Sequence, residues 1–582
     1  MEEVRSSHQA FWKITKVLKT EGYTPIPPLK RPNDSIALDD VEVAECIADS
    51  IETQCSHVFP PHDIAHINSI EEEVIQKTTL EPKDDLTPVS LSEVQTLVKS
   101  ISTRKAPGLD GEAEVIGIHK PGKPRDLPAS YRPICLLSGL AKLFERVLKT
   151  RLSNHLFGKS LIIDEQFGFC SAHSCSQQVL RLVEYVSEGF KTKQKTVAVF
   201  FDVAKAFDRV WHAGLAYKLY SLQVPDRLIL IIQNFLSNRH FTFRHERTHS
   251  TRRLIRAGVP QGSALSPLLY SAYTNDIPRL TSGVQLALFA NDTALFFSRT
   301  RRSIFRHLLR AIDELSQWFR KWRIEVNPDK SAAIQFKYSK NRSKLVVDWN
   351  TPNLKIMNAR IPWQRSYKYL GVTLDKNLHF REHITRVRKN ALFYTARLGA
   401  MVGRKSKLSR RNKRTLYKMC IRTVMTYACP VFAHAVPKAL YRLQVIQNKF
   451  CRAATDAHWC LRNSILHRDL ELPTLPKYMK GASKRFFDIA RSHPKALLRA
   501  AVDYQPPPPT HLIRRPRNVL IDPPDALTAE EREPTHEGFR THPMPRRQPL
   551  GVVHRAKSRA VGTHTCRPAA HGKAIIVVRP VV

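Results

Sequence analysis

The chain has 582 residues, 42% of them hydrophobic, so it is long enough for more than one domain and apolar enough to bury extended cores. Lysine and arginine outnumber aspartate and glutamate by 93 to 51, a formal net charge of +42, and a surplus of this size indicates a polyanionic partner. No apolar run approaches the ~20 residues of a membrane span, so we expect no membrane partner and favour RNA or DNA over a membrane surface or a ribosomal context.

Residues 1–100 form the first expected region, a mixture of helices and linker. Apolar residues recur at roughly helical spacing over residues 11–17, and a proline-rich linker follows at residues 25–29. Two further helices are predicted, at 40–56 and 91–101. The second ends before the turn signal Lys105-Ala106-Pro107-Gly108.

Strands and helices alternate in the second expected region, residues 101–375. The patterns predict strands at 114–118, 197–201, 346–349 and 368–374, a hairpin at 286–297, and helices at 136–156, from 214, and at 304–324. Such a mixture indicates the α+β class, with a sheet covered by helices.

The remaining sequence divides into a basic helical region, 376–503, and a tail, 504–582. The densest positive cluster consists of Arg404, Lys405, Lys407, Arg410, Arg411, Lys413 and Arg414. Taken alone, this cluster suits either nucleic-acid binding or a solvated helix face. The tail is rich in proline and arginine and lacks apolar periodicity, so we expect it to be disordered.

The ten cysteines are sparse and form no Cys-x-x-Cys pair. Cys170 and Cys175 enclose His173, which leaves a metal clip as a minor alternative to free thiols. The first residues have no secretory pattern. We therefore expect reduced thiols and an intracellular protein of the nucleus and cytoplasm.

Three stretches carry candidate chemistry. An apolar strand ends at Asp202, which suits a divalent-ion ligand exposed at a strand end or, alternatively, a helix cap. A loop around Gly258, Pro260, Gln261 and Gly262 suits close approach of backbone to a ligand, or an ordinary loop before a helix. The hairpin places Asn291 and Asp292 at its turn. Carboxylates that converge from separate strands are what two-metal phosphoryl transfer requires.

Together these stretches resemble the reverse transcriptases of non-LTR retrotransposons, in particular the jockey-like elements of animals. Further matching segments follow in the family's order: 105–111 (KAPGLDG), 119–123 (HKPGK), 130–134 (SYRPI), Trp322 with Asn327 and Lys330, and 369–371 (YLG). The Asp202, Gln261 and Asn291–Asp292 stretches are similar to polymerase motifs A, B and C. The resemblance extends from the N-terminus to about residue 530.

The resemblance implies a right-hand polymerase, with fingers and palm in residues 101–375 and a thumb in 376–503 that grips a nucleic-acid duplex through the basic cluster. It implies an RNA template, a DNA primer, deoxynucleoside triphosphates and two Mg²⁺ ions, with Mn²⁺ as an alternative. Asp202, Asp292 and the Val203 carbonyl would hold the metal, and Asn291 occupies the third catalytic position. The residues implied to contact the nucleotide are Lys120, Lys123, Arg132, Phe207, Gln261, Gly262 and Lys330.

Four departures from the family pattern shape the functional expectation. Asn291 stands where relatives have an aspartate, so we expect impaired catalysis. Gly111 runs directly into Glu112, where relatives have additional finger residues, so part of the fingers is expected to be missing. Cys170 and Cys175 replace an arginine and a threonine, which weakens the zinc interpretation. The endonuclease that precedes the polymerase in relatives is not recognisable, so target cleavage is expected to occur in trans.

Alternative interpretations follow from the same departures. A non-catalytic RNA- or DNA-binding remnant of such an element would retain the basic region without nucleotide incorporation. A translated pseudogene without a role is a third interpretation. A maturase-like splicing factor is a weaker fourth one, because no segment resembles the DNA-binding or nuclease parts of that class.

Overall fold

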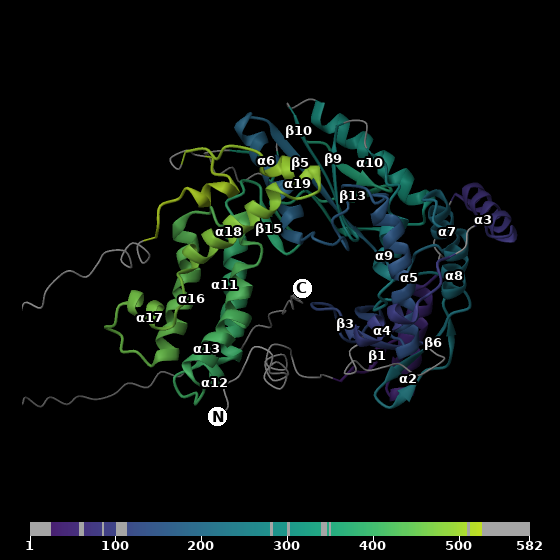
Figure 1. The fold of residues 1–582 in the computed structure, drawn as a ribbon, viewed down its shortest axis with the longest axis horizontal. Coiled ribbons are helices and arrows are strands. Elements are labelled where there is room, and N and C mark those ends of the chain that lie inside the picture. The colour runs from purple at the N-terminus through teal and green to yellow at the C-terminus, as the bar shows by residue number, and fades with distance from the viewer. Residues whose placement is uncertain are drawn as a thin grey trace, which may run out of the picture.

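A computed structural model describes residues 25–56, 63–83, 86–100, 113–279, 283–299, 303–338, 346–347, 351–508 and 513–525 (Figure 1). The predicted helix at 11–17, the turn at 105–108, the 111/112 junction and the end of the tail lie outside the described residues. The described chain mixes helices and strands, which confirms the α+β class. No described helix combines the length and apolar character that crossing a bilayer requires.

A four-stranded antiparallel sheet lies at the centre of the molecule, in the order β11-β5-β10-β9. Its strands are β5 (Lys195–Val203), β9 (Gln285–Phe289), β10 (Asp292–Arg299) and β11 (Val326–Phe336). Residues 196–201 of β5 are all buried, because helices cover both faces of the sheet. Alternate residues point to opposite faces: Phe200 packs in the cluster that contains α6 (Cys175–Lys191), and Phe201 packs in the cluster that contains α10 (Ser303–Lys321).

A second sheet carries the chain segments that precede and follow β5 in the sequence. Its strands run in the order β4-β3-β6-β7, with β8 also paired to β6. They are β3 (Ala113–His119), β4 (Tyr131–Leu136), β6 (His240–His245), β7 (Thr248–His249) and β8 (Arg253–Leu254). The helix α2 (Asp40–Gln54) covers this sheet, with Ile47 and Ile51 packed in one cluster with Val115 and Phe243.

Around the two sheets, helices lie near the predicted positions 40–56, 91–101, 136–156 and 304–324 and after 214, whereas α6 and α3 were not predicted. In α3, Ile67, Ile70 and Val74 occur at helical spacing and join the same core as α10. The short strands β1 and β2 pair beside α2. The remaining elements of this part are β1 (Leu29–Lys30), β2 (Ile36–Ala37), α3 (Ile64–Thr79), α4 (Leu91–Ser100), η1 (Pro128–Ser130), α5 (Gly139–Gly158), α7 (His212–Ser221), α8 (Asp226–Leu236) and α9 (Ser266–Tyr273).

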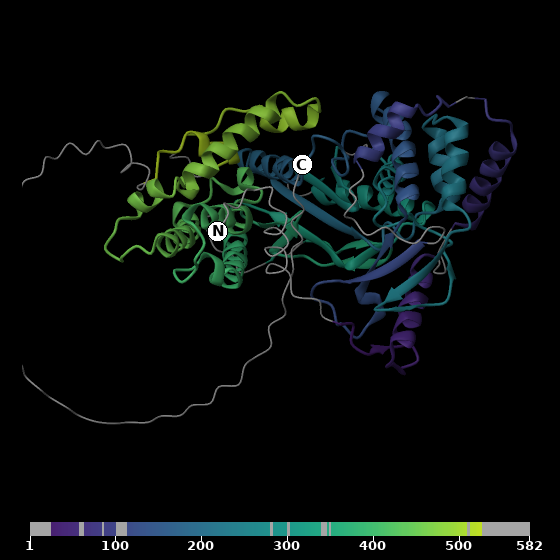
Figure 2. The same cartoon turned by 60° about the horizontal axis from the view of Figure 1, so that its bottom comes forward.

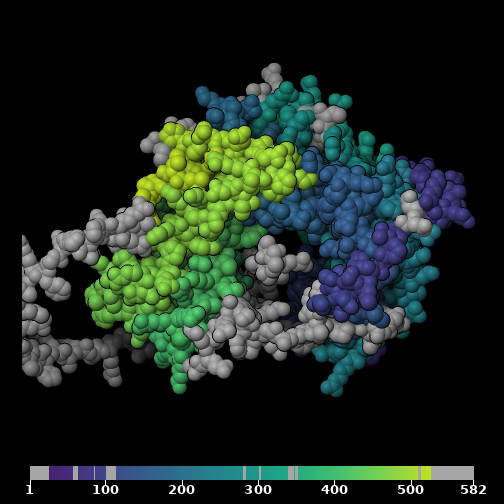
Figure 3. Space-filling model, viewed as in Figure 1, coloured from purple at the N-terminus to yellow at the C-terminus, as the bar shows by residue number. Residues whose placement is uncertain are grey.

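Two small hairpins and a helical region complete the described chain. The helical region lies on the opposite side of the central sheet from the second sheet in both ribbon views (Figures 1 and 2), and the space-filling view shows a recess between the two sides (Figure 3). The elements are β12 (Leu354–Ile356), β13 (Ala359–Ile361), β14 (Ser366–Tyr369), β15 (Val372–Asp375), α11 (Arg381–Arg397), α12 (Gly399–Val402), α13 (Arg410–Leu416), the π-helix η2 (Tyr417–Arg422), α14 (Thr423–Thr426), α15 (Cys429–Phe432), α16 (Pro437–Thr455), α17 (Asn463–Asp469), α18 (Leu475–Arg491), α19 (Ala496–Val502) and η3 (Pro516–Leu520).

Two expectations differ from the described structure. Residues 346–347 of the predicted 346–349 strand form a bend. The tail expected to be disordered from residue 504 packs on the molecule over residues 504–508 and 513–525. Arg515 is buried there, with Nε 2.9 Å from Glu184 Oε2 and Nη1 2.6 Å from Glu188 Oε2. Val519 is buried in the same core as α6, Ile513 and Leu520 pack against that core, and the ion pairs of Arg515 add to these contacts. Such apolar residues are too few to give a periodic pattern, so periodicity did not reveal the segment.

Candidate active site

Two carboxylates face each other at one end of the central sheet. Asp202 is the penultimate residue of β5, Asp292 is the first residue of β10, and the two are direct cross-strand partners. Direct partners in an antiparallel pair place their side chains on the same face, with Cβ atoms about 4.5–5.5 Å apart. The sheet therefore brings together the two aspartates that the sequence singled out.

The electrostatics of this pair favour a bound cation. Burial and the negative charge of Asp202 together raise the pKa of Asp292 to about 6, against the opposing positive charge of Lys330. No group of three or more His, Cys, Asp or Glu side chains gathers as a metal site within the described ranges. The donor set is thus two carboxylates with hard oxygen atoms, which fits a divalent ion such as those that nucleotide polymerases use.

The hairpin turn lies one residue earlier than predicted. Asp292 pairs with Phe289, so Ala290 and Asn291 form the two-residue turn and Asp292 already belongs to the strand. Ala290 has a positive φ of 59°, and such turns need left-handed backbone at their centre. Asn291 is therefore a turn residue next to the carboxylate pair.

The segment that contains Gln166 and Gly168 contacts this turn directly. The side-chain oxygen Oε1 of Gln166 accepts hydrogen bonds from the backbone N–H groups of Gly168 (2.9 Å) and Ala290 (3.2 Å). A Cβ atom on Gly168 would lie 2.0 Å from the backbone nitrogen of Ala290. Only glycine fits at this position, and the turn is held in place by backbone contact. Sequence reasoning missed this support, for which the glycine of Gly168-Phe169 was the available signal.

Lys330 reaches the carboxylate pair from the neighbouring strand. Its Nζ donates to Oδ2 of Asp202 at 3.1 Å. The pairing of β11 with β5 is interrupted between Asn327 and Ala332, and Asn327 Oδ1 accepts from the backbone N–H of Lys330 at 3.2 Å. Lys330 is therefore displayed by a bulge, a common device near active sites, and its side chain remains 56% exposed.

Phe207 forms an aromatic platform beside the carboxylates. Its ring stacks on Tyr270 with centroids 5.2 Å apart and meets the edge of Phe169 at 5.9 Å. Its carbonyl accepts from the backbone N–H of Val259 at 2.7 Å. Gly258 has a φ of +94°, and a Cβ there would lie 2.6 Å from the carbonyl oxygen of Asp208. The glycine-containing loop thus packs directly against the turn that carries Phe207.

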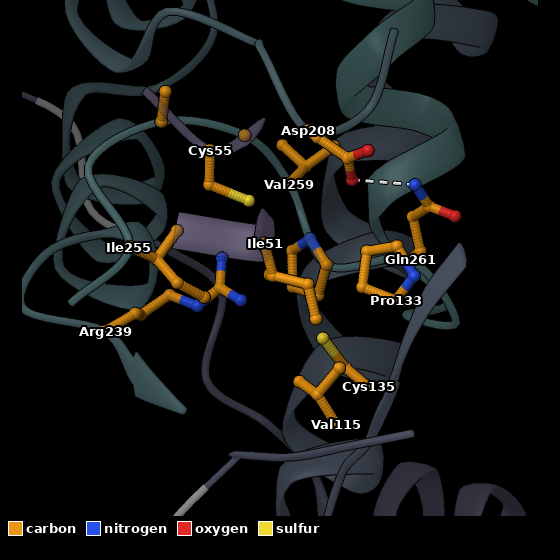
Figure 4. A pocket seen from close by; sticks show the side chains of 13 residues that line it. Ile51, Cys55, Val115, Pro133, Cys135, Asp208, Arg239, Ile255, Val259 and Gln261 are labelled. Atoms are coloured by element: carbon orange, nitrogen blue, oxygen red, sulfur yellow. Dashed lines mark hydrogen bonds between the residues drawn. The ribbon is translucent and has the colours of Figure 1, made fainter. Parts of the chain in front are cut away.

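Gln261 is held at both its side chain and its backbone (Figure 4). Its Nε2 donates to Oδ1 of Asp208 at 2.7 Å, and its carbonyl accepts from the N–H of Cys135 at 2.9 Å. Asp208 is 6% exposed; burial raises its pKa to about 6, and the Gln261 hydrogen bond opposes the rise. Because an ionised carboxylate only accepts hydrogen bonds, Asp208 selects the NH₂ side of the Gln261 amide.

Several cations share this region. Lys120 donates its Nζ to the carbonyl of Ala129 at 2.7 Å. Burial lowers the pKa of Lys120, Asp208 opposes that shift, and the charges of Lys205, Arg132 and Lys330 lower the pKa further. Lys205, which sequence reasoning missed, has a positive φ of 48° in the turn after β5. Lys123 lies on the exposed turn that contains Gly122.

This leaves Gly262, which was predicted to contact the nucleotide, and Val203, whose carbonyl was predicted to bind the metal. Gly262 has a φ of +106°, and a Cβ there would lie 3.0 Å from the carbonyl oxygen of Cys135. Val203 is the last residue of β5 and pairs with Val326 on β11. Val203 therefore lies next to Asp202 at the end of β5, whereas Gly262 lies against β4 of the second sheet.

The side chains of the predicted basic cluster differ in their exposure and in the partners that they contact. Lys405, Lys407, Arg410 and Arg411 are exposed. Arg404 pairs with Asp456 and Arg414 with Glu471. Lys413 is buried and donates its Nζ to the carbonyl of Gly403 at 3.0 Å. In this structure α13 turns the Lys413 side chain into the helix packing, and its contact with nucleic acid stays a prediction.

The Cys170–Cys175 segment is occupied by packing and hydrogen bonds. Cys170, Cys175 and the other described cysteines are free thiols. His173 Nδ1 lies 2.7 Å from the carbonyl oxygen of Ser171, and its ring meets the edges of Phe167 and His493. These contacts connect the segment to the chain that follows α18.

Comparisons with known proteins place these features in a family. Residues 118–374 match the family described as reverse transcriptase (RNA-dependent DNA polymerase). The chain is 31% identical over 541 residues to the probable RNA-directed DNA polymerase from transposon BS of Drosophila melanogaster, covering 85% of this chain and 58% of that protein. It is 30% identical over 539 residues to the RNA-directed DNA polymerase from mobile element jockey of the same species, covering 85% and 57%. The chain therefore spans less than two thirds of the length of these relatives.

Two solved structures are similar at low identity. Apo telomerase from Candida tropicalis matches with 10% identity and a TM-score of 0.32, over 65% of this chain and 71% of that chain. The RNA-dependent RNA polymerase of a human picobirnavirus matches with 11% identity and a TM-score of 0.34, over 76% and 84%.

Proposed function

We propose that the chain is the polymerase part of a non-LTR mobile element of the jockey-like group, which copies RNA into DNA. The match of residues 118–374 to the reverse transcriptase family supports this proposal. The direct pairing of Asp202 with Asp292, with Lys330 bonded to Asp202, is the observation that carries the proposal. In this assignment residues 101–375 are fingers and palm, and 376–503 are the thumb. The substrates are an RNA template, a DNA primer and deoxynucleoside triphosphates.

The proposed metal is Mg²⁺, with Mn²⁺ as a substitute. Asp202, Asp292 and the carbonyl of Val203 would hold it, and the Asn291 amide supplies a neutral oxygen where relatives have a carboxylate. A bound divalent ion would lower the pKa of the attacking hydroxyl and neutralise phosphate charge. The pKa of Asp292, near 6 without metal, means that this carboxylate is mostly ionised at neutral pH and ready to bind a cation.

The surrounding residues take roles that follow from their positions. Lys120, Lys205 and Arg132 supply positive charge for the triphosphate, since their charges already act on one another in the empty protein. Phe207 presents its ring to the sugar, and Gln261 with Gly262 approaches the nucleotide and the template. Lys330, whose amine is within reach of the reacting centre, would donate a proton to the departing pyrophosphate.

Asn291 is expected to slow this reaction. Two ions carry a charge of +4, and two carboxylates offset less of it than three. A loss of ~3–5 kcal/mol in transition-state stabilisation lowers the rate by about 10²–10⁴-fold. This observation favours one second function: an RNA- or DNA-binding protein that retains the polymerase fold with little incorporation.

Primer extension with purified protein tests the proposal. The assay uses an RNA template, a labelled DNA primer, and either Mg²⁺ or Mn²⁺, for the wild type, Asn291→Asp, and Asp202→Asn as the inactive control. We expect weak extension by the wild type, a large gain for Asn291→Asp and none for Asp202→Asn. If Asn291→Asp binds primer–template but does not extend it, the non-catalytic function is the better account.

A further inference from the structure

An exposed tryptophan projects from the loop between α16 and α17. The side chain of Trp459 is 79% exposed, the most exposed large apolar side chain among the described residues. The loop is at the end of the helical region far from the four-stranded sheet (Figure 1). Its position is separate from the carboxylate pair, and none of its residues belongs to the proposed polymerase site.

The loop that carries Trp459 is anchored at both ends. Arg452 on α16 donates to the carbonyls of His458 and Leu461 and to Oδ1 of Asn463. Arg404 pairs with Asp456 at 3.3 Å and donates to the carbonyl of Ala457 at 3.3 Å. The indole is therefore displayed by a fixed backbone instead of a loose loop. A rigidly displayed aromatic ring loses little entropy on binding.

A basic hollow adjoins the anchored loop. Its volume is about 360 Å³, and its lining includes Arg404, Tyr441, Lys449, Arg452 and Asn463. Tyr441 is itself 59% exposed. Lys449 is exposed on the same helix. Near these lining residues in the sequence, the cations Lys405, Lys407, Arg442 and Arg462 are also exposed.

Exposed aromatic rings beside cations match one ligand chemistry. An exposed indole can stack on a base only when that base is not already stacked within a duplex, and phosphates pair with the adjacent cations. We propose that Trp459, Tyr441 and the hollow around Lys449 form a binding platform for single-stranded nucleic acid within the 376–503 region, apart from the carboxylate pair Asp202 and Asp292. RNA and DNA share the stacking and phosphate chemistry, and the proposal does not depend on catalysis.

Fluorescence anisotropy of the full chain with a labelled 12-nucleotide single-stranded RNA tests the platform. Trp459→Ala should weaken binding by about 5- to 100-fold, the range that loss of one base–aromatic stack covers, and Trp459→Phe should keep most of the affinity. Lys449→Ala should weaken binding and reduce the slope of log affinity against log salt by about 0.7. Leu140→Ala, at a side chain 74% exposed on α5, is the matched control and should bind like the wild type.

Two further arms distinguish the sources of the ligand. If stacking and phosphate pairing are the whole interaction, Trp459→Ala should weaken the binding of the corresponding DNA oligonucleotide as much as the binding of RNA. If 2′-hydroxyls contribute, Trp459→Ala should weaken DNA binding less than RNA binding. Both results support the platform. Photocrosslinking with 5-iodouridine RNA should label the peptide that contains Trp459.

The proposal is overturned if Trp459→Ala binds within twofold of the wild type or if Leu140→Ala weakens binding equally. It is also overturned if Trp459→Ala weakens the binding of a blunt RNA duplex as much as the binding of the single strand, or if the crosslink maps only to residues 101–375. Each of these results is independent of primer extension, so failure of the platform and failure of the polymerase proposal are distinguishable.

Discussion

Adding a single methyl group at Gly168 should displace the catalytic turn. In Gly168→Ala the new Cβ would lie 2.0 Å from the nitrogen and 2.9 Å from the Cα of Ala290. Ordinary van der Waals separation is near 3.5 Å, so the turn must move by at least about 1 Å. Misplacement of catalytic groups by about 1 Å costs about 100-fold in rate. Overpacking against backbone also costs about 1–3 kcal/mol in the free energy of unfolding.

The assay for this prediction compares primer extension and thermal unfolding in the Asn291→Asp background, where the rate is expected to be measurable. Gly139→Ala is the matched control, since a Cβ at Gly139 meets no atom within 4 Å. We expect Gly139→Ala to behave as its parent, and Gly168→Ala to extend primers about 100-fold more slowly with a lower Tm. Unchanged extension and an unchanged Tm for Gly168→Ala would refute the argument that backbone contact positions the turn.

Three further predictions concern buried charges. The folded protein binds a proton at Asp292 more tightly than the unfolded chain does, because the pKa of this carboxyl is raised from 3.8 to about 6. The stability contributed by this group is therefore lost as pH rises from about 4 to 6. The affinity for Mn²⁺, measured by calorimetry, should rise through pH 6, and a pH-independent affinity would contradict this prediction. Arg515→Ala removes the cation that pairs with Glu184, a side chain that is 2% exposed, and should lower the free energy of unfolding, measured with denaturant, by about 3–5 kcal/mol. The double variant Glu184→Gln/Arg515→Met should recover part of that loss. An equal or larger loss of stability in the double variant would argue against a stabilising ion pair. In the Asn291→Asp background, Asp208→Asn should raise the KM for deoxynucleotides more than it lowers kcat. This effect should disappear when Gln261 has already been replaced by alanine. Additive effects of the two substitutions would show that Asp208 does not act through Gln261.

The sequence predicted the strands that carry Asp202 and Asp292, because both follow apolar runs typical of buried β-structure. The register that makes them direct partners could not be predicted, since it depends on how the separate strands pair across the fold. The same limit explains why the turn was predicted one residue late. The α+β class and several helix positions, such as those of α2, α5 and α10, followed from periodicity, whereas α3 and α6 were not predicted.

Other features depend on contacts between distant segments. The contact of Gly168 with Ala290 joins residues more than a hundred positions apart, so the glycine could signal a close approach but could not identify its partner. Lys413 lies in a basic run and was expected to be exposed, but the packing of α13 buries it. The segment around Arg515 lacks apolar periodicity, yet Arg515 stacks on Tyr504, with the guanidinium carbon 3.6 Å from the ring centroid, and pairs with Glu184.

Single-turnover primer extension by the wild type and Asn291→Asp, with Asp202→Asn as the blank, tests the central claim most directly. We predict RNA-templated, divalent-ion-dependent incorporation that rises by about 10²–10⁴-fold in Asn291→Asp and is absent in Asp202→Asn. Equal and robust rates for the wild type and Asn291→Asp would contradict the account of Asn291. Incorporation that survives in Asp202→Asn would contradict the assignment of the active site itself.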